Sequence, residues 1–203
     1  MTDKVRFLLD RSEGLDGYRL LTGLIVPRPI GWIGTVRSDG TFNLAPFSFF
    51  NLISVEPPVV IFSGGRREGV LKDSVRFAEE AGEFTVNIVS EAVAEAMNVT
   101  SASFKSSVDE FAEAGLTPVV GSVVAAPLVA ESPANLECRV IDAMDIGGAT
   151  GSRLIFGEVL VVHVQPGLLE GSRIDSDALR AVGRLAGSNY IHTRDRFQLG
   201  RPG

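Results

Sequence analysis

The sequence is poor in the residues that most often build metal sites and disulfides. It has one cysteine, Cys138, and two histidines, His163 and His192. One cysteine excludes an intrachain disulfide and any Cys-x-x-Cys redox motif. Two histidines leave too small a ligand set for a Cys/His metal site, so we expect no metal. Cys138 is interpreted as a small buried apolar residue, and His163 as a histidine of the core or of a barrel rim.

Long apolar runs and an excess of positive charge are also missing. No run approaches the length of a membrane span, and the charges scattered through residues 1–14 are not typical of a signal peptide. The formal net charge of −6 argues against binding to nucleic acid or to anionic membranes. A content of 45% hydrophobic and 22% charged residues is typical of a globular chain. Together these features predict a cytoplasmic protein.

Motifs that would carry side-chain chemistry are absent as well. The sequence has no Gly-x-Ser-x-Gly elbow and no His-Glu-x-x-His motif. Residues 64–69 do not form a P-loop, because Val70 and Leu71 stand where lysine and Ser/Thr are required. No Gly-x-Gly-x-x-Gly follows a predicted strand, so a Rossmann dinucleotide site is not expected. This pattern favours chemistry carried by a bound cofactor.

Three successive predicted strands organise the chain. They lie at residues 29–36, 41–53 and 59–62. The turn Ser38-Asp39-Gly40 separates the first two, and Pro57-Pro58 ends the second because proline cannot donate to a strand ladder. Within the long second strand, polar side chains alternate with phenylalanines. Such a mixture suits a flat ligand with hydrogen-bonding edges.

The rest of the chain also favours strands, with helices in the connections. Strands are expected at 84–88, 136–146 and 153–164, and helices at 70–81, 91–97 and 175–181. Many strands without regular β–α alternation favour a closed antiparallel barrel over a doubly wound sheet. We expect residues 1–203 to form a single domain, with an N-terminal extension at 1–20 and a C-terminal tail at 187–203.

Several stretches carry a specific resemblance. They are Arg28-Pro29-Ile30-Gly31-Trp32-Ile33, Asn43-Leu44-Ala45-Pro46-Phe47-Ser48-Phe49-Phe50-Asn51, Pro57-Pro58, Phe62-Ser63, Lys72-Asp73-Ser74, Leu136-Glu137-Cys138, Gly183-Arg184-Leu185 and Gly187-Ser188-Asn189-Tyr190. With them the chain resembles the flavin reductase-like family of FMN-binding split barrels, the branch that includes flavoredoxin, over residues 20–195. The resemblance implies a mainly β fold, a Greek-key split barrel with short helices in the connections. It also implies a homodimer with FMN at the subunit interface.

The strand at residues 43–51 is the first candidate site. In an arbitrary protein its pattern is typical of a core strand with a few solvent-facing polar residues. In the family that the chain resembles, the corresponding strand lies along the flavin, with backbone amides and a serine at the ring edge and the ribityl chain. The resemblance therefore implies a flavin lining of Ala45, Pro46, Phe47, Ser48, Phe49 and Asn51.

The loop expected at residues 63–69, directly before a predicted helix, is the second candidate site. A helix N-terminus offers unpaired N–H groups and a partial positive charge, which suit a phosphate. Arginine and lysine side chains add charge-assisted donors. A solvated charged loop is the common alternative. The predicted phosphate-binding residues are Ser63, Arg66, Arg67, Lys72 and Ser74.

The C-terminal part of the chain supplies the third candidate set, called the tail set below: Arg184, Tyr190 and His192. These residues either belong to a surface tail with ordinary packing or fold over the open face of the flavin, in the same or a neighbouring subunit. In the second case Arg184 and Tyr190 help to bind the cofactor. His192 then contacts a nicotinamide or its phosphates and is the candidate catalytic residue.

The resemblance implies an NAD(P)H-dependent flavin reductase. Hydride would pass from NADH or NADPH, bound transiently as co-substrate, to FMN. The reduced flavin would serve a partner such as a monooxygenase or an electron-transfer protein. Two rivals stay open: a flavoredoxin-type electron carrier that holds FMN tightly, and a flavin-binding protein without turnover. A barrel that oxidises a vitamin-like amine is a weaker alternative. One site serves all of these functions, so the sequence alone does not separate them.

Overall fold

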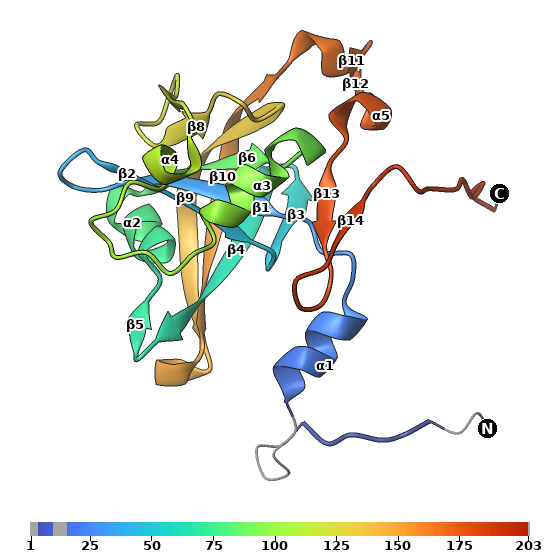
Figure 1. The fold of residues 1–203 in the computed structure, drawn as a ribbon, viewed down its shortest axis with the longest axis horizontal. Coiled ribbons are helices and arrows are strands. Elements are labelled where there is room, and N and C mark those ends of the chain that lie inside the picture. Colours follow the sequence, from blue (N-terminus) through green and yellow to red (C-terminus); the bar gives the residue numbers. More distant parts are fainter. Residues whose placement is uncertain (1–3, 10–15, 203) are drawn as a thin grey trace.

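The computed structural model describes residues 4–9 and 16–202, and one antiparallel sheet dominates it (Figure 1). The strand order is β2-β1-β6-β9-β10-β4-β3, with β5 paired to β4. These strands are β1 (Gly31–Val36), β2 (Phe42–Phe47), β3 (Phe50–Val55), β4 (Pro58–Arg67), β5 (Val70–Leu71), β6 (Glu83–Ile88), β9 (Ala134–Ile146) and β10 (Ser152–Val164). Short hairpins outside the sheet are β7 (Pro118–Val120) with β8 (Pro127–Val129), β11 (Leu169–Glu170) with β12 (Arg173–Ile174), and β13 (Val182–Arg184) with β14 (Tyr190–His192).

Helices occupy the connections, as predicted. They are α1 (Gly17–Leu24), α2 (Asp73–Ala81), α3 (Ala94–Val99), α4 (Glu110–Ala114) and α5 (Ser176–Leu179), with 3-10 turns at Glu91–Val93, Gly148–Thr150 and Pro166–Leu168. Gly82 ends α2 with a φ of 72°, a left-handed conformation that glycine adopts at little cost. Asp109 and Asp175 cap α4 and α5 by accepting hydrogen bonds from backbone amides. Within the described ranges, no helix is long and apolar enough to cross a bilayer.

The sheet curls on itself because its two outermost strands are consecutive in the chain. β2 pairs with β1 at one end of the strand order, and β3 pairs with β4 at the other. Between them the backbone leaves the ladder at Ser48 and Phe49. The prediction of one long strand at residues 41–53 is therefore wrong. A straight strand could not pair with both edges of the sheet, so the chain bends between them.

A hairpin replaces the loop predicted at residues 63–69. Residues 63–67 belong to β4, and the chain turns back through Glu68 and Gly69, with φ values of 52° and 81°, into β5. Positive φ at both turn residues matches the twist of a two-residue hairpin. Because β5 occupies residues 70 and 71, α2 begins at Asp73 and not at residue 70 as predicted.

Apolar clusters cover both faces of β1. On one face, Phe62 lies between Phe47 and Phe84, with ring centroids 5.2 and 5.1 Å from its own. Ile33 belongs to this inner cluster, whereas its neighbour Trp32 packs on the other face, in a second cluster that includes residues of α3 and α4. Successive residues of a strand point to opposite faces, so double burial fixes the register of β1 firmly.

Glu137 of β9 is a fully buried carboxylate that holds the segment between β7 and β8. It accepts hydrogen bonds from the Ser122 hydroxyl at 2.6 Å and from the backbone amides of residues 122–124 at 2.7–3.0 Å. His163 Nε2, on the half-exposed surface of β10, lies 2.6 Å from Oε1. Burial acts to raise the pKa of Glu137, but the bonds from Ser122 and His163 lower it to about 2. A Cβ on Gly121 would lie 2.6 Å from Oε2, so the segment needs glycine there.

We predict that Glu137→Ala lowers the free energy of unfolding by about 3 kcal/mol or more, because several buried donors lose their acceptor. Glu158→Ala is the matched control, since the Glu158–Arg139 pair of 2.7 Å is solvent-accessible and worth at most about 1 kcal/mol. Urea unfolding at neutral pH measures both variants. Equal stabilities of the two variants would contradict the assigned role.

The depressed pKa of Glu137 also sets a pH dependence. A carboxylate whose pKa is lower in the folded state contributes stability above its usual pKa of 4.5, and this stability is lost as the pH falls toward about 2. Unfolding curves recorded across this interval should show the loss for the unaltered protein and a weaker one for Glu137→Ala.

Candidate functional site

The site begins at the bend between β2 and β3, where the backbone leaves the sheet. Exposure changes across this bend: Phe47 is 5% exposed and points into the core, whereas Phe49 is 48% exposed. Pro46 and Ser48 are half-buried at the surface between them. Of the predicted flavin lining, Pro46, Ser48 and Phe49 therefore present side chains to a ligand. Phe47 can offer only its backbone.

Other predicted lining residues frame the bend from the neighbouring strands. Ala45 of β2 packs partly against the inner core cluster. Asn51 of β3 is exposed, and its side-chain oxygen accepts from the Leu52 amide at 2.9 Å. Ser63 of β4 is half-buried, and its amide donates to the Phe49 carbonyl at 2.9 Å. The bend is thus enclosed by β4 on one side and continues into exposed β3 on the other.

Arg28 lies directly behind the bend and is only 7% exposed. Its Nε donates to the Ser48 hydroxyl at 3.3 Å, and its Nη2 donates to the Leu185 carbonyl at 3.1 Å. Its Nη1 donates to the carbonyls of Thr22 and Ile25 at 2.8 and 3.0 Å. One buried guanidinium therefore connects α1, the bend and the segment that follows β13.

A small cavity of about 90 Å³ opens beside Arg28. It is lined by Ile30, Pro46, Ser48, Met97, Ser101, Arg184 and Tyr190. Pro46 and Ser48 come from the predicted flavin lining, whereas Arg184 and Tyr190 come from the predicted tail set. The structure thus brings together two groups of residues that are more than 130 positions apart in the chain.

The hairpin of β13 and β14 fixes the tail residues. Arg184 and Tyr190 are paired opposite each other in its register. The guanidinium of Arg184 lies 4.6 Å from the centre of the Tyr190 ring and donates to the tyrosine hydroxyl and to the Gly187 carbonyl. Backbone bonds between Arg28 and Arg184, at 2.8 and 3.0 Å, join the hairpin to the barrel. Arg184 and Tyr190 are therefore held in place by the hairpin and form one side of the small cavity.

The predicted phosphate residues are not gathered in one place. Arg66 binds the Asp145 carboxylate at 2.7 Å, and this contact with its positive charge lowers the pKa of Asp145. Ser74 is 2% exposed and accepts from the Asn43 amide at 2.8 Å inside the protein. Arg67 and Lys72 are exposed, and the Lys72 ammonium lies 5.4 Å from the centre of the Phe47 ring. The charged groups of Arg67 and Lys72 therefore lie at the surface.

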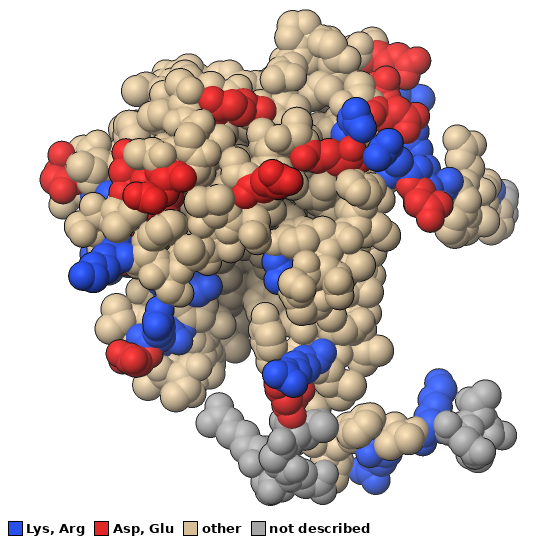
Figure 2. All heavy atoms as spheres, in the orientation of Figure 1, with Lys and Arg blue, Asp and Glu red and all other residues tan. Residues whose placement is uncertain are grey.

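Figure 2 shows the face of the molecule that Figure 1 turns toward the viewer. A hollow lies there between the β4–β5 hairpin and α1, with basic side chains on both of its sides. Most acidic side chains of the same face form a band above the hollow. The whole chain has a formal charge of −6, so this arrangement concentrates positive charge locally against the net sign. Such a distribution attracts anionic ligands to the hollow.

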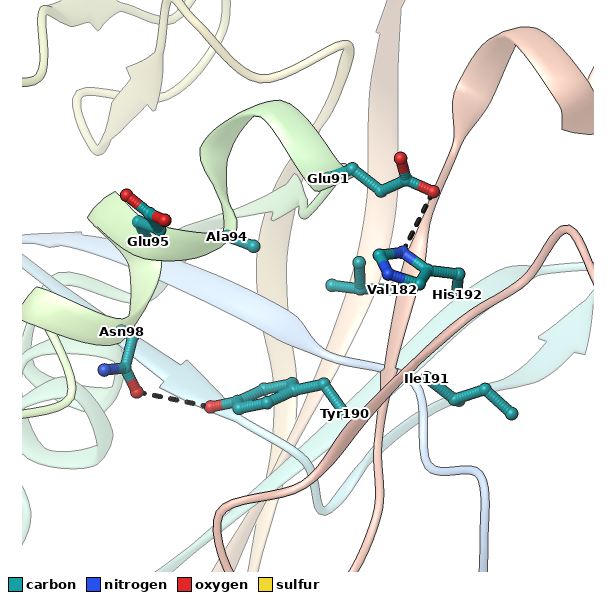
Figure 3. A pocket seen from close by; sticks show the side chains of 8 residues that line it. All are labelled: Glu91, Ala94, Glu95, Asn98, Val182, Tyr190, Ile191 and His192. Carbon is teal, nitrogen blue, oxygen red and sulfur yellow. Dashed lines mark hydrogen bonds and ion pairs between the residues drawn. The ribbon is translucent and has the colours of Figure 1, made fainter.

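A larger pocket of about 330 Å³ lies between α3 and β14 (Figure 3). It is lined by Glu91, Ala94, Glu95, Asn98, Val182, Tyr190, Ile191 and His192. Tyr190 and His192 point from β14 toward α3, and the Tyr190 hydroxyl lies 3.4 Å from the Asn98 side-chain oxygen. Because Tyr190 lines both this pocket and the small cavity, the two spaces are neighbours across its ring.

Glu91, which lines this pocket, contacts three basic side chains. Its carboxylate lies 3.0 Å from His192 Nδ1, 2.9 Å from Arg194 Nε and 2.9 Å from Arg180 Nη2. Burial acts to raise the pKa of Glu91, but the charges of Arg180 and Arg194 lower it below its usual value. The Glu91 carboxylate lies beside Nδ1 of His192, which leaves Nε2 available to a ligand.

The described residues contain no cluster of three or more His, Cys, Asp or Glu side chains arranged for a metal ion. Cys138 is fully buried in the inner core, as predicted, and burial raises the pKa of its thiol well above the usual range. It therefore provides neither a metal ligand nor a nucleophile.

Sequence reasoning missed Arg28, Glu91 and Asn98 as site residues. Arg28 stands between two prolines in an apolar segment, and such a charge has to be buried or turned outward, which is a usable signal. Glu91 at the start of a predicted helix is indistinguishable from an ordinary charge in a first helical turn. Its role depends on residues 180, 192 and 194, which come beside it only in the folded chain.

Comparison with known proteins shows which family and which solved structures share this architecture. The family model described as "Flavin reductase like domain" matches residues 23–188. Nitrilotriacetate monooxygenase component B from Bacillus cereus has a TM-score of 0.91 and 35% identity, covering 97% of this chain and 100% of that chain. Flavoredoxin of Desulfovibrio vulgaris (Miyazaki F) has a TM-score of 0.73 and 25% identity, with coverages of 85% and 90%.

A protein from Shewanella frigidimarina NCIMB 400 with a split barrel domain has a TM-score of 0.84 and 22% identity, with coverages of 98% and 100%. This likeness bears on the fold alone. Together with the strand order, it confirms the predicted mainly β split barrel with short helices in its connections. By the family match and the likeness of its whole length to solved members, the chain belongs to the flavin reductase-like domain family.

Proposed function

We propose that this protein is an NAD(P)H-dependent flavin reductase that uses FMN. The observation that carries the proposal is the meeting of the β2–β3 bend with the β13–β14 hairpin, beside a pocket of ring size. Bound FMN would supply an acceptor for hydride from the nicotinamide. The residues of the chain then have to bind and orient two flat rings and exclude water between them.

The exposed surface of the bend fits a flavin ring. Pro46 and Phe49 offer apolar contact, while the Ser48 hydroxyl offers a hydrogen bond to a polar ring edge. Ala45, Asn51 and Ser63 flank this surface and complete the proposed lining. The cavity of about 90 Å³ is smaller than the usual range of about 300–1,000 Å³ for ligand pockets. A single chain therefore leaves the ring partly uncovered.

We infer that a second copy of the chain provides the cover. Strand β3 follows the bend at the outer edge of the strand order and exposes large apolar side chains. Leu52, Ile53 and Val55 are 53%, 50% and 77% exposed. A contiguous apolar strand beside an incomplete ligand site is typical of an interface. A twofold dimer would bury it and bring a second surface over each flavin.

The basic hollow supports a phosphate position near the β4–β5 hairpin. Arg67 and Lys72 are exposed there, whereas Arg66 shares its charge with Asp145 and Ser74 lies beneath the surface. We propose that Arg67 and Lys72 contribute most of the charge-assisted contacts to the FMN phosphate. Arg66 then supports the hairpin through its ion pair with Asp145.

The pocket between α3 and β14 supports a nicotinamide position. Its volume suits one ring, its walls are mainly apolar, and Tyr190 separates it from the proposed flavin surface. With the imidazole proton on Nδ1, directed at the Glu91 carboxylate 3.0 Å away, Nε2 of His192 is an acceptor for the carboxamide N–H of a nicotinamide. The reduced flavin would then serve a monooxygenase or another electron acceptor.

A flavoredoxin-type electron carrier is the second candidate function. The likeness to flavoredoxin, at 25% identity, favours it specifically. Such a carrier would need the flavin surface but would have no use for a nicotinamide pocket. The two functions therefore differ in the role of the space between α3 and β14.

The central prediction is that the purified protein binds FMN and that NADH or NADPH bleaches the flavin absorbance in stopped-flow mixing. The two nicotinamides are tested separately. A protein that leaves the spectrum of added FMN unchanged would contradict the proposal. Bleaching by a reduced protein donor, with none by either nicotinamide, would establish the carrier function instead.

His192→Ala is the informative variant in the same experiment. Loss of a hydrogen-bonding group that positions the nicotinamide should raise the KM for the nicotinamide or slow bleaching, with FMN affinity unchanged. Asp195→Ala, on the same exposed tail but outside the pocket lining, is the matched control. Equal rates for the two variants would remove His192 from the reaction.

The phosphate proposal predicts that Arg67→Ala and Lys72→Ala each weaken FMN by about 1.5–3 kcal/mol, the usual value of a hydrogen bond to a charged group. Arg66→Ala should weaken it less, because Asp145 already occupies this arginine. Riboflavin lacks the phosphate and is the control ligand in fluorescence titrations. If FMN and riboflavin weaken equally, these residues act on the fold or on the ring.

The interface proposal predicts a dimer by light scattering at micromolar concentration and a monomer for Leu52→Asp. At a twofold interface the substitution places a buried charge on each chain, so the desolvation cost of that charge occurs twice. Leu169→Asp on β11 changes a side chain of similar exposure, 51%, away from β3. An unaltered protein that is monomeric with FMN fully bound would show that one chain builds the whole site.

A further inference from the structure

Arg28 is a buried cation whose hydrogen-bond acceptors among the described residues are all neutral. Three of them are backbone carbonyls and the fourth is the Ser48 hydroxyl. Among the described residues, no carboxylate lies within 4.0 Å of its guanidinium, in contrast to Arg37, Arg66 and Arg153. A buried charge of one sign without an opposite partner is costly. Its field is also screened less than that of a surface charge.

The field of Arg28 points at the proposed flavin surface. Its Nε donates to Ser48 Oγ at 3.3 Å, so the hydroxyl proton of Ser48 has to point away from Arg28. Ser48 lines the small cavity, and its hydroxyl is thereby directed as a donor toward a ligand. The guanidinium carbon also lies 6.0 Å from the centre of the exposed Phe49 ring. The positive charge is therefore one side chain behind the ligand surface.

We propose that Arg28 is a positioning residue that favours the reduced, negatively charged form of the flavin, acting through its charge and through Ser48. This inference rests on the proposed function. Transfer of hydride leaves the nicotinamide as a cation and places one negative charge on the flavin ring. A buried cation without a carboxylate partner stabilises that charge relative to the neutral oxidised ring. Arg28 thus makes the bound flavin easier to reduce.

The same residue also holds structure together, so the test has to separate charge from architecture. Sulfite adds to oxidised flavin and leaves a negative charge on the same ring, without any nicotinamide or turnover. Its dissociation constant therefore reports the electrostatic environment of the ring. The two-electron reduction potential, measured against a reference dye, reports the same property independently.

The experiment compares Arg28→Gln with Arg28→Lys in the full chain loaded with FMN. Arg28→Gln removes the charge and should raise the sulfite dissociation constant at least tenfold. A tenfold change in the equilibrium corresponds to about 30 mV for a two-electron couple, so the potential should fall by at least this amount. Arg28→Lys keeps the charge and should stay close to the unaltered protein. Arg37→Gln, at a similarly buried arginine that faces Glu110 at 3.9 Å, should change neither quantity.

Unchanged sulfite affinity and potential in FMN-loaded Arg28→Gln would overturn the inference. An Arg28→Lys variant that behaves like Arg28→Gln would do the same, because geometry and not charge would then be decisive. Should Arg28→Gln fail to fold, the unaltered protein supplies the measurement. The dependence of its potential on pH should show that bound reduced FMN loses its ring proton at least one pH unit below free reduced FMN. A transition at the free value, or above it, overturns the inference.

The outcomes also separate this inference from the proposed function. Sulfite binding and potential require bound FMN but no nicotinamide. FMN binding without bleaching by NADH or NADPH would remove the reductase activity and leave the role of Arg28 to be decided by sulfite. A chain that binds no FMN overturns both.

Discussion

One stretch of chain, residues 42–55, has to pair with both outer edges of the same sheet. It does so by leaving the ladder at Ser48 and Phe49, where the Phe49 carbonyl still accepts a hydrogen bond from the Ser63 amide of β4. In the interior, Phe47, Phe62 and Phe84 pack against one another. Closing the barrel therefore places the bend at the surface, outside this core. We expect a flat ligand to use this surface and not the interior.

The bend needs support from outside the sheet, and Arg28 gives it. Its guanidinium reaches the end of α1, the bend and the segment after β13 at once, so three separate parts of the chain share one cation. Hydrogen bonds to neutral oxygens offset part of its desolvation, but a carboxylate would have offset more. The fold thus retains a positive charge behind Ser48 at a cost in stability. Such an arrangement is more readily explained by a ligand than by packing.

The sequence predicts the β-rich architecture well because local patterns carry it. Strand alternation, the turn at Asp39-Gly40 and the helix end at Gly82 are all visible in neighbouring residues. It fails where distant residues decide the outcome. The apolar run at residues 41–53 does not show that its two halves pair with different strands. Nor does the sequence Arg66-Arg67 show that Arg66 forms an ion pair with Asp145. Likewise, the candidate tail residues are predictable, whereas the Glu91 carboxylate that holds His192 is not.

The distribution of charge distinguishes the two spaces that share Tyr190. Basic side chains surround the hollow below the bend, whereas the pocket at α3 carries Glu91 and Glu95 on its walls (Figures 2 and 3). A phosphate is favoured in the first space. In the second space Arg180 and Arg194 contact Glu91 and balance its charge, and Glu95 adds one negative charge. A nicotinamide bound here as proposed would become a cation as it loses hydride, and the Glu95 carboxylate in the lining would stabilise that charge. Of the two contacts expected for His192, the ring is therefore favoured over the phosphates. Tyr190 belongs to the hairpin that Arg28 joins to the barrel, through backbone bonds to Arg184 and through its guanidinium bond to the Leu185 carbonyl. Arg28 therefore also fixes the side chain that separates the two spaces.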